Sequence, residues 1–403
     1  MFHGYMAING TEILNSARTK VYADTYLPGI GVKCAHPDLR IALAHNPYTS
    51  PQTDAAPWYN ALRPSSARFY GFFPVKIQGA EDSTQAVEGQ ELTGSGGVHV
   101  SPRDAMREIR VVCIGLAADE EALADGLSWL KDVLENAGCR DGYDCVGREV
   151  NMFHAAPSST SDAYSLHRTF YGVAVQSGPK VTEWFPSKVG AMQRVEFVLE
   201  AGIPWPFTDL TSVASLLLSS GSNYTDPVGE DCSMATDATD NFINDPFFTG
   251  ISPAPQPPNI LPPNVINITS WRRLTAPIGA AMTTRPGRVT PVVTVLSGSV
   301  DAQFIRIRFY RSGAGLSGCD YSGEYLISYL PANSMMVIDA IRKQVSVTLP
   351  DGRLVPGGHL LYGSAGRPFM WPDMSCKDTY TMTADMFPGQ TGIVVNLETA
   401  VRD

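Results

Sequence analysis

Short runs of apolar, aromatic and β-branched residues recur along the chain and predict strands. Turn residues separate the runs, and in Gln303–Arg311 apolar and charged residues alternate, which indicates one buried face and one face in water. The predicted strands are Arg68–Gln78, Arg107–Leu116, Val146–His154, Arg168–Gln176 and Met192–Ala201, and later Thr290–Leu296, Gln303–Arg311, Gly323–Leu330, Met335–Asp339, Gln344–Leu349, Thr379–Ala384 and Thr391–Leu397.

One segment follows the helical period instead. Leu123, Leu127, Leu130 and Leu134 recur at intervals of three and four residues, so they form one apolar stripe. Acidic residues open the segment at 119–121, where the helix dipole favours them, and a glycine at 138 is a natural stop. The pattern predicts a single helix among the strands of the first half.

The connections between these elements divide the chain. Segments 31–66 and 79–99 are polar and rich in Pro or Gly, which predicts loops, and Ile203–Phe207 contains two prolines that a central strand does not tolerate. Segment 208–265 is acidic and then proline-rich, as in a semi-rigid linker. We therefore predict a mainly β protein with an α+β domain at 1–207, a linker at 208–265 and a β-sandwich or jelly roll at 266–403.

Composition narrows the classes of function. The 403 residues carry a formal net charge of −10 with no long basic run, which argues against nucleic-acid binding. Charged residues make up only 17%, which suits a chain that buries surface against partners. No basic, then apolar signal segment opens the sequence, and no apolar stretch reaches the ~18 residues of a spanning helix, so no membrane insertion is expected.

Catalytic and metal-binding patterns are absent from the sequence. None of the seven histidines lies in an HExxH, HxH or HxxxH pattern, GxSxG is missing, and the acidic segment Asp226–Asp240 lacks the spacing of an EF-hand loop. Cys139 and Cys145 form a local disulfide or remain two free thiols; their spacing does not suit zinc. We predict no catalytic, cofactor or metal site, and no enzyme.

Aromatic residues near the C-terminus leave two interpretations open. They can form a sugar-stacking platform, or they can pack within the core and against protein partners, which is the more common use of such residues. The four residues concerned are Tyr362, Phe369, Trp371 and Tyr380.

Several longer patterns resemble a known family. The proline tract NDPFFTGISPAPQPPNILPP (244–263), SWRRL (270–274), QFIRIRFYR (303–311), GEYLISYLP (323–331), IDAIR (338–342) and HLLYGSAGRPFMWPDMSC (359–376) are similar to minor tail proteins of long-tailed actinobacterial phages. The N-terminal half, with its helix among strands and its close at GIPWPF (202–207), resembles the distal tail protein of siphophages. The resemblance covers most of the chain, least well 31–100 and 208–240.

The resemblance implies a belt-type N-terminal barrel that forms a ring, typically a homohexamer, and a galectin-like or carbohydrate-binding-like C-terminal sandwich facing outward. The ring would join the tail tube protein to the tail-tip hub and the tape measure in a virion assembled in the host cytoplasm. The long 31–100 region departs from a minimal belt domain, and we expect it to supply arms that clasp a neighbouring subunit.

Two other classes of function compete with a structural ring protein. One is a carbohydrate-binding adhesin that contacts the host cell wall through the C-terminal sandwich. The other is a glycan hydrolase, for which the sequence offers no acid and base signature.

Overall fold

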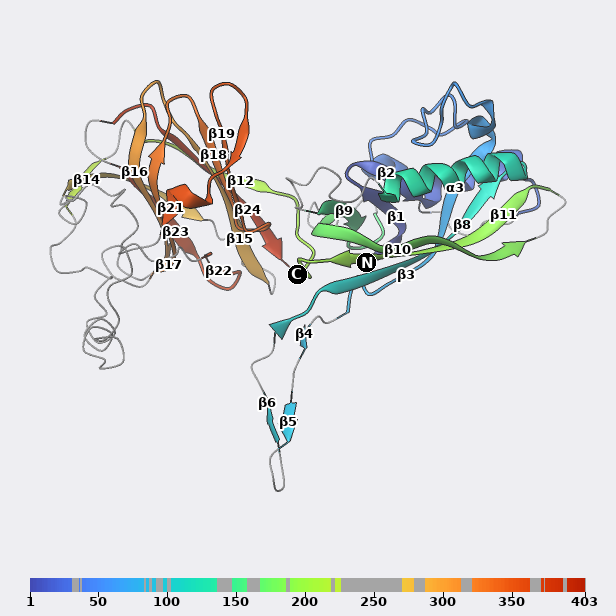
Figure 1. The fold of residues 1–403 in the computed structure, drawn as a ribbon, viewed down its shortest axis with the longest axis horizontal. Helices are drawn as coiled ribbons and strands as arrows, with labels where there is room; N and C mark the ends of the chain where they lie inside the picture. Colours follow the sequence, from blue (N-terminus) through green and yellow to red (C-terminus); the bar gives the residue numbers. More distant parts are fainter. Residues whose placement is uncertain are drawn as a thin grey trace, which may run out of the picture. The chain divides into compact units, whose positions relative to one another are not determined.

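The computed structural model divides into two compact units, Met1–Asp209 and Leu210–Asp403 (Figure 1). The residues that the structure describes are 1–30, 36, 38–82, 85–86, 89–91, 97–99, 103–135, 147–157, 167–185, 189–218, 222–225, 270–278, 287–312, 321–362, 371–372, 374–386 and 390–402.

The first unit is a closed barrel in which the strands follow the order β1-β2-β3-β8-β11-β10-β9. Neighbouring strands are antiparallel, except that β2 and β3 share one parallel pair, Leu14 with Phe72. The buried side chains of all seven strands form a single hydrophobic core. The strands are β1 (Phe2–Ile8), β2 (Thr11–Asn15), β3 (Phe69–Gln78), β8 (Arg107–Ala117), β9 (Arg148–Phe153), β10 (Arg168–Phe185) and β11 (Ala191–Ala201).

Helix α3 (Glu120–Glu135) packs on this core, as the leucine stripe predicts. Leu123, Leu130 and Leu134 are buried, and Asp119 caps the helix by accepting a hydrogen bond from the Ala122 amide at 3.0 Å. A Cβ at Gly126 would lie 2.4 Å from the ring of Phe69, so the helix approaches β3 closely at a position that only glycine allows.

The expectation of one helix is wrong. Helix α1 (Ser16–Tyr26) follows β2 directly, and short turns α2 (Asp38–Ala42) and η1 (Pro64–Arg68) lie in the segment predicted as loop. The Asn15 side chain caps α1 by accepting from the Arg18 amide at 3.0 Å. The helix carries no continuous apolar stripe, so periodicity does not reveal it.

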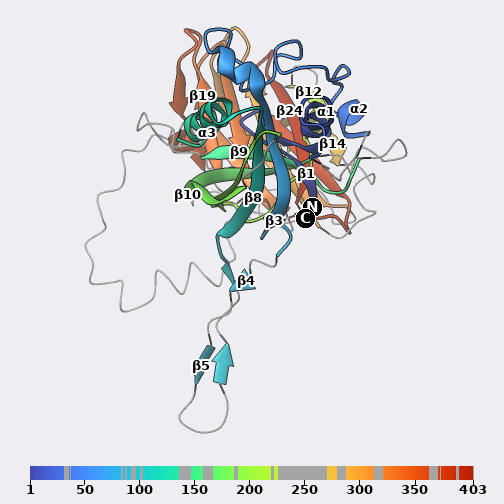
Figure 2. The same cartoon turned by 90° about the vertical axis from the view of Figure 1, so that its right-hand side faces the viewer.

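Between β3 and β8 the chain forms a long hairpin. Two short ladders, β4 (Gln85–Ala86) with β7 (Arg103–Asp104) and β5 (Gly89–Glu91) with β6 (Gly97–His99), continue the pairing of β3 with β8 (Figure 2). The described residues of 79–99 thus include strands, where the sequence predicts a loop.

The second unit consists of two antiparallel sheets. One has the order β12-β24-β15-β18-β19-β20, with β22 also paired to β15, and the other has the order β13-β14-β23-β16-β17-β21. The strands are β12 (Thr211–Leu217), β13 (Ser222–Thr225), β14 (Ser270–Ile278), β15 (Arg288–Leu296), β16 (Ala302–Arg311), β17 (Tyr321–Leu330), β18 (Met335–Asp339), β19 (Gln344–Thr348), β20 (Leu354–Pro356), β21 (Leu361–Tyr362), β22 (Met374–Ser375), β23 (Tyr380–Met386) and β24 (Val394–Arg402), with one further turn, η6 (Gly358–Leu360).

The mainly β fold class is confirmed, with a helix-bearing barrel followed by a two-sheet unit. Strands β12 and β13 lie within 208–265, the range predicted as a linker, and each pairs with a strand of the second unit. The proline tract itself lies outside the described residues.

Candidate assembly surface

The sheet β3-β8-β11-β10 runs through the barrel wall and has two open edges in the described part of the chain. On one side, β10 pairs with β9 only over Arg168–Val173, and from Ala174 to Phe185 its ladder is with β11 alone. On the other side, β3 meets β2 only at Phe72, and from Phe73 to Gln78 its ladder is with β8 alone. An open strand edge presents backbone N–H and C=O groups that another strand can pair with.

The open part of β10 also exposes large apolar side chains. Val181 is 45% exposed, Trp184 is 53% exposed, and Val189, just before β11, is 43% exposed. Val75 on the open part of β3 is 43% exposed. Since large apolar side chains gathered at one surface mark interaction sites more often than single exposed ones do, the β10 edge qualifies as an apolar contact surface, whereas the β3 edge qualifies through its unpaired backbone groups.

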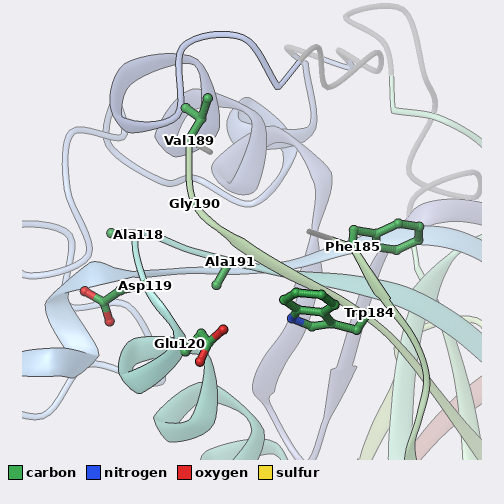
Figure 3. A pocket seen from close by; sticks show the side chains of 8 residues that line it. All are labelled: Ala118, Asp119, Glu120, Trp184, Phe185, Val189, Gly190 and Ala191. Carbon is green, nitrogen blue, oxygen red and sulfur yellow. The ribbon is translucent and has the colours of Figure 1, made fainter. Parts of the chain in front are cut away.

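A pocket of about 280 Å³ lies beside the open end of β10. Figure 3 shows the carboxylates of Asp119 and Glu120 at the start of α3, and the rings of Trp184 and Phe185 on the strand. Asp119 is already engaged, because Arg68 Nη1 lies 2.5 Å from its Oδ2 atom. The pocket therefore offers an aromatic wall and a partly neutralised acidic rim, without a nucleophile or a metal-ligand set.

The outer face of this sheet carries charged side chains, and some of them form ion pairs between neighbouring strands. Arg110 Nε lies 3.3 Å from Glu196 Oε1, and Arg194 Nη1 lies 3.6 Å from Glu183 Oε2. These groups are half exposed, so each pair contributes little to stability. The ion pairs also show that the Glu183 side chain lies on the outer face of the sheet, as do those of Arg110 on β8 and Arg194 on β11.

The base of the long hairpin is fixed by one arginine. Arg107 Nη1 donates to the carbonyl of Gly79 at 2.9 Å, its Nε donates to the carbonyl of Pro204, and its guanidinium lies 5.7 Å from the ring centre of Phe170. Gly79 has φ +84°, and a Cβ there would lie 1.9 Å from the carbonyl oxygen of Glu108. The hairpin thus leaves the barrel in a direction set by a glycine and a buried cation.

In the second unit, charged side chains tie three strands together. Asp385 on β23 is fully buried and accepts from Arg273 Nε on β14 at 2.7 Å and from Arg306 Nη2 on β16 at 2.9 Å. Because all three groups are buried and paired, the cluster joins strands and does not present a binding face.

The four aromatic residues singled out in the sequence do not share one described surface. Tyr380 is 4% exposed, and its hydroxyl accepts from the Ser375 amide at 2.9 Å. Trp371 is half buried, with its ring 6.3 Å from that of Tyr325, and Tyr362 on β21 is half buried and separated from β23 by two strands. Phe369 lies outside the described residues, as do Cys139, Cys145 and the acidic segment 226–240.

Candidate chemistry is sparse in the described part of the chain. No group of three or more His, Cys, Asp or Glu side chains there suits a metal ion, and no described helix is long and apolar enough to cross a membrane. Burial raises the pKa of the Cys113 thiol, which keeps it protonated at neutral pH.

Sequence reasoning missed the open part of β10. The predicted strand ends at Gln176 because Gly178 and Pro179 follow it, yet β10 continues to Phe185 with shifts in register. Residues 180–185 (KVTEWF) include two β-branched and two aromatic residues, and this composition marks a strand even after a breaker.

No family model and no curated protein matches this chain. Among solved structures, it is similar to the Dit protein of phage SPP1, described as a paradigm of the hub adsorption apparatus of phages that infect Gram-positive bacteria. That match has 10% identity and a TM-score of 0.39, and covers 81% of this chain and 92% of that one. The baseplate of phage P2 in its activated conformation with Ca is similar at 7% identity and a TM-score of 0.37, covering 79% and 92%.

Proposed function

We propose that this chain is a structural protein of a phage tail tip, of the distal tail type, which assembles into a ring. The observation that carries the proposal is the sheet β3-β8-β11-β10 with open edges on opposite sides. A surface that meets a different surface of an identical copy makes a head-to-tail contact, and such contacts close into rings when the rotation allows.

The sequence supports the same function. The patterns at 202–207, 244–263, 303–311 and 359–376 resemble distal and minor tail proteins of actinobacterial siphophages. That resemblance implies a barrel with an embedded helix followed by a β-sandwich, and the chain has a helix-bearing barrel followed by a two-sheet unit. A ring requires contact surfaces, and the exposed apolar residues at the open part of β10 provide one.

The resemblance also supplies the partners. The ring would be a hexamer that lies between the tail tube protein and the tail-tip hub, with the tape measure passing toward the tube, in a virion assembled in the host cytoplasm. Segment 208–265 would act in part as a connection to the second unit, which would face outward.

Native mass spectrometry and electron microscopy of the purified full-length chain test the proposal. We expect a closed ring, with six copies as its main species. A chain that stays monomeric over a wide concentration range, and also in the presence of its tube and hub proteins, would contradict the proposal.

A further inference from the structure

We propose that the pocket at the start of α3 binds an arginine side chain of another protein of the assembly. Trp184 on β10 and Glu120 on α3 both line this pocket. In Figure 3 the Glu120 carboxylate extends toward the ring of Trp184. The binding site itself does not require a ring, whereas the presence of a second protein rests on the proposed function.

The pocket lies on the side of the sheet that faces α3. Trp184 pairs with Gln193 on β11, and Gln193 pairs with Gly115 on β8. A Cβ at Gly115 would lie 3.0 Å from the Leu123 side chain of α3, so this row of residues faces the helix. The opposite face of the sheet is the one that carries the cross-strand ion pairs. Small residues that leave space beside the helix complete much of the lining, namely Ala118, Gly190 and Ala191.

One carboxylate at this pocket has no counter-charge in the described part of the chain. Arg68 Nη1 lies 2.5 Å from Asp119 Oδ2, and Nη2 of the same side chain lies 3.0 Å from Glu121 Oε2. The acids on either side of Glu120 are therefore paired, whereas no described basic side chain forms an ion pair with Glu120 itself. Because Glu120 lies in the first turn of α3, the helix dipole favours its ionised form.

An exposed indole beside an unpaired carboxylate suits a guanidinium group. Trp184 is 53% exposed, so the face of its ring is accessible to a cation. A guanidinium stacks on aromatic rings, donates two parallel hydrogen bonds to a carboxylate and is more weakly hydrated than an ammonium group. We therefore expect arginine to bind here more tightly than lysine, and the acids at the rim to repel anionic groups.

The placement of the chain's own arginines favours another protein over a second copy as the source. Arg63 is exposed and forms no ion pair with a described residue, but it directly precedes η1, which packs along α3 where Ser65 donates to Asp125. Arg63 and the pocket thus lie along the same helix, and their mutual insertion would give a twofold dimer, not the head-to-tail contact of a ring. The net charge of −10 also favours a basic partner.

Fluorescence of Trp184 in the full-length chain tests the site with a defined probe. The probe is the peptide acetyl-Gly-Arg-Gly-amide, and subtracting the signal of a Trp184→Phe chain isolates the contribution of Trp184. We expect the peptide to change this contribution in a saturable way. The matching lysine peptide should bind more weakly, and the peptide with citrulline, an uncharged isostere of arginine, should not bind measurably.

Two neighbouring glutamates provide matched variants. Glu120→Gln should weaken binding of the arginine peptide about fivefold, because it removes the carboxylate that extends toward Trp184. Glu121→Gln removes the same charge one residue away, from a side chain that Arg68 already holds, and should change the affinity less than about twofold. Equal effects would show that the general field of the acids attracts the peptide, which overturns the assignment. Each variant is measured against its own Trp184→Phe background, and circular dichroism verifies its folding.

The outcomes separate this inference from the proposed function. If the citrulline peptide binds as tightly as the arginine peptide, or if neither binds, the arginine site is overturned and the ring function stands. If ring formation alone protects Trp184 from acrylamide quenching and from the peptide, a second copy fills the pocket, and the assignment to another protein is overturned. A wild-type chain that never forms a ring overturns the proposed function, while specific binding of the arginine peptide would still support the site.

Discussion

A buried ion pair lies at the start of the first unit. Glu12 and Arg18 are each 6% exposed, with Arg18 Nε 2.9 Å from Glu12 Oε1. Asn15 donates to the second carboxylate oxygen at 2.7 Å and also to the Tyr48 hydroxyl at 3.0 Å, which connects β2, α1 and the loop before η1. Burial raises the pKa of Glu12, while Arg18 and Asn15 act to lower it, so the carboxyl depends on these two partners.

Removing one partner of this pair should be costly. Glu12→Ala leaves the Arg18 guanidinium buried without its counter-charge, and we expect a loss of about 3–5 kcal/mol in the free energy of unfolding. Urea unfolding followed by circular dichroism measures this loss. Glu135→Ala, which removes an exposed carboxylate paired with Lys131, is the control, with an expected change below about 0.5 kcal/mol. Equal effects of the two substitutions would contradict a structural role for Glu12.

Substitutions at two glycines distinguish the cost of backbone strain from the cost of a steric clash. Gly79 and Gly10 both have positive φ, +84° and +75°, but an added Cβ meets the Glu108 carbonyl at Gly79 and nothing within 4 Å at Gly10. Gly10→Ala should therefore cost about 1 kcal/mol, from backbone strain alone. Gly79→Ala should cost clearly more, and should loosen the hairpin base, as measured by unfolding and by proteolysis between β3 and β8. An equal loss in the free energy of unfolding for the two substitutions would show that the backbone at the hairpin base shifts to accommodate the added Cβ without cost.

Single residues show where sequence reasoning stops. The aromatic residues Tyr362, Trp371 and Tyr380 look alike in sequence, yet Tyr380 is buried within a strand and the other two are half buried. Alternation predicts which face of a strand is apolar, but not which neighbouring strand covers it. The exposure of Trp184 likewise follows from the ladder between β9 and β10 reaching only to Val173, and no property of residues 180–185 reveals that.

Helix α3 was predictable because its own pattern determines it. The leucine stripe is independent of what the helix packs on, so its period and its acidic first turn suffice. Helix α1 contrasts with it, since its buried residues include Arg18 and Thr19 as well as Tyr22 and Ala23, and tertiary contacts decide its burial. The cap at Asn15 was its one local signal, and a cap without a stripe is weak.

The leucine stripe of α3 also predicts that truncating its leucines lowers the free energy of unfolding by different amounts, according to how deeply each leucine is buried. Leu130 is 0% exposed, whereas Leu127 is only partly buried against the same core. Leu130→Ala should lower the free energy of unfolding by about 2–5 kcal/mol through lost contacts and a cavity, and Leu127→Ala by less. Chemical unfolding of the two matched variants measures the difference. A larger cost at Leu127 would mean that the helix is rotated from the orientation described.

At the scale of the whole molecule, the two units differ in the surfaces that they offer for assembly. The first unit has its own hydrophobic core and carries both open edges, so the proposed ring contacts require only this unit. The second unit buries its charges in cross-strand pairs such as Asp385 with Arg306, and both its sheets are built from its own strands. The composition of segment 208–265 predicts a division of the chain into two domains. It does not predict strands β12 and β13 within that segment, because these strands form by pairing with residues far away in the sequence.

This division predicts where assembly resides. A fragment of residues 1–209 should fold alone and form the same ring as the full-length chain, because β3, β10 and the core that supports them all lie in it. A fragment of residues 210–403 should fold but remain monomeric. Circular dichroism establishes folding, and light scattering coupled to size exclusion gives the mass of each species. If the first fragment is folded and monomeric while the full-length chain forms rings, the contacts that close the ring lie in the second unit, and the open edges of the barrel are not the assembly surface.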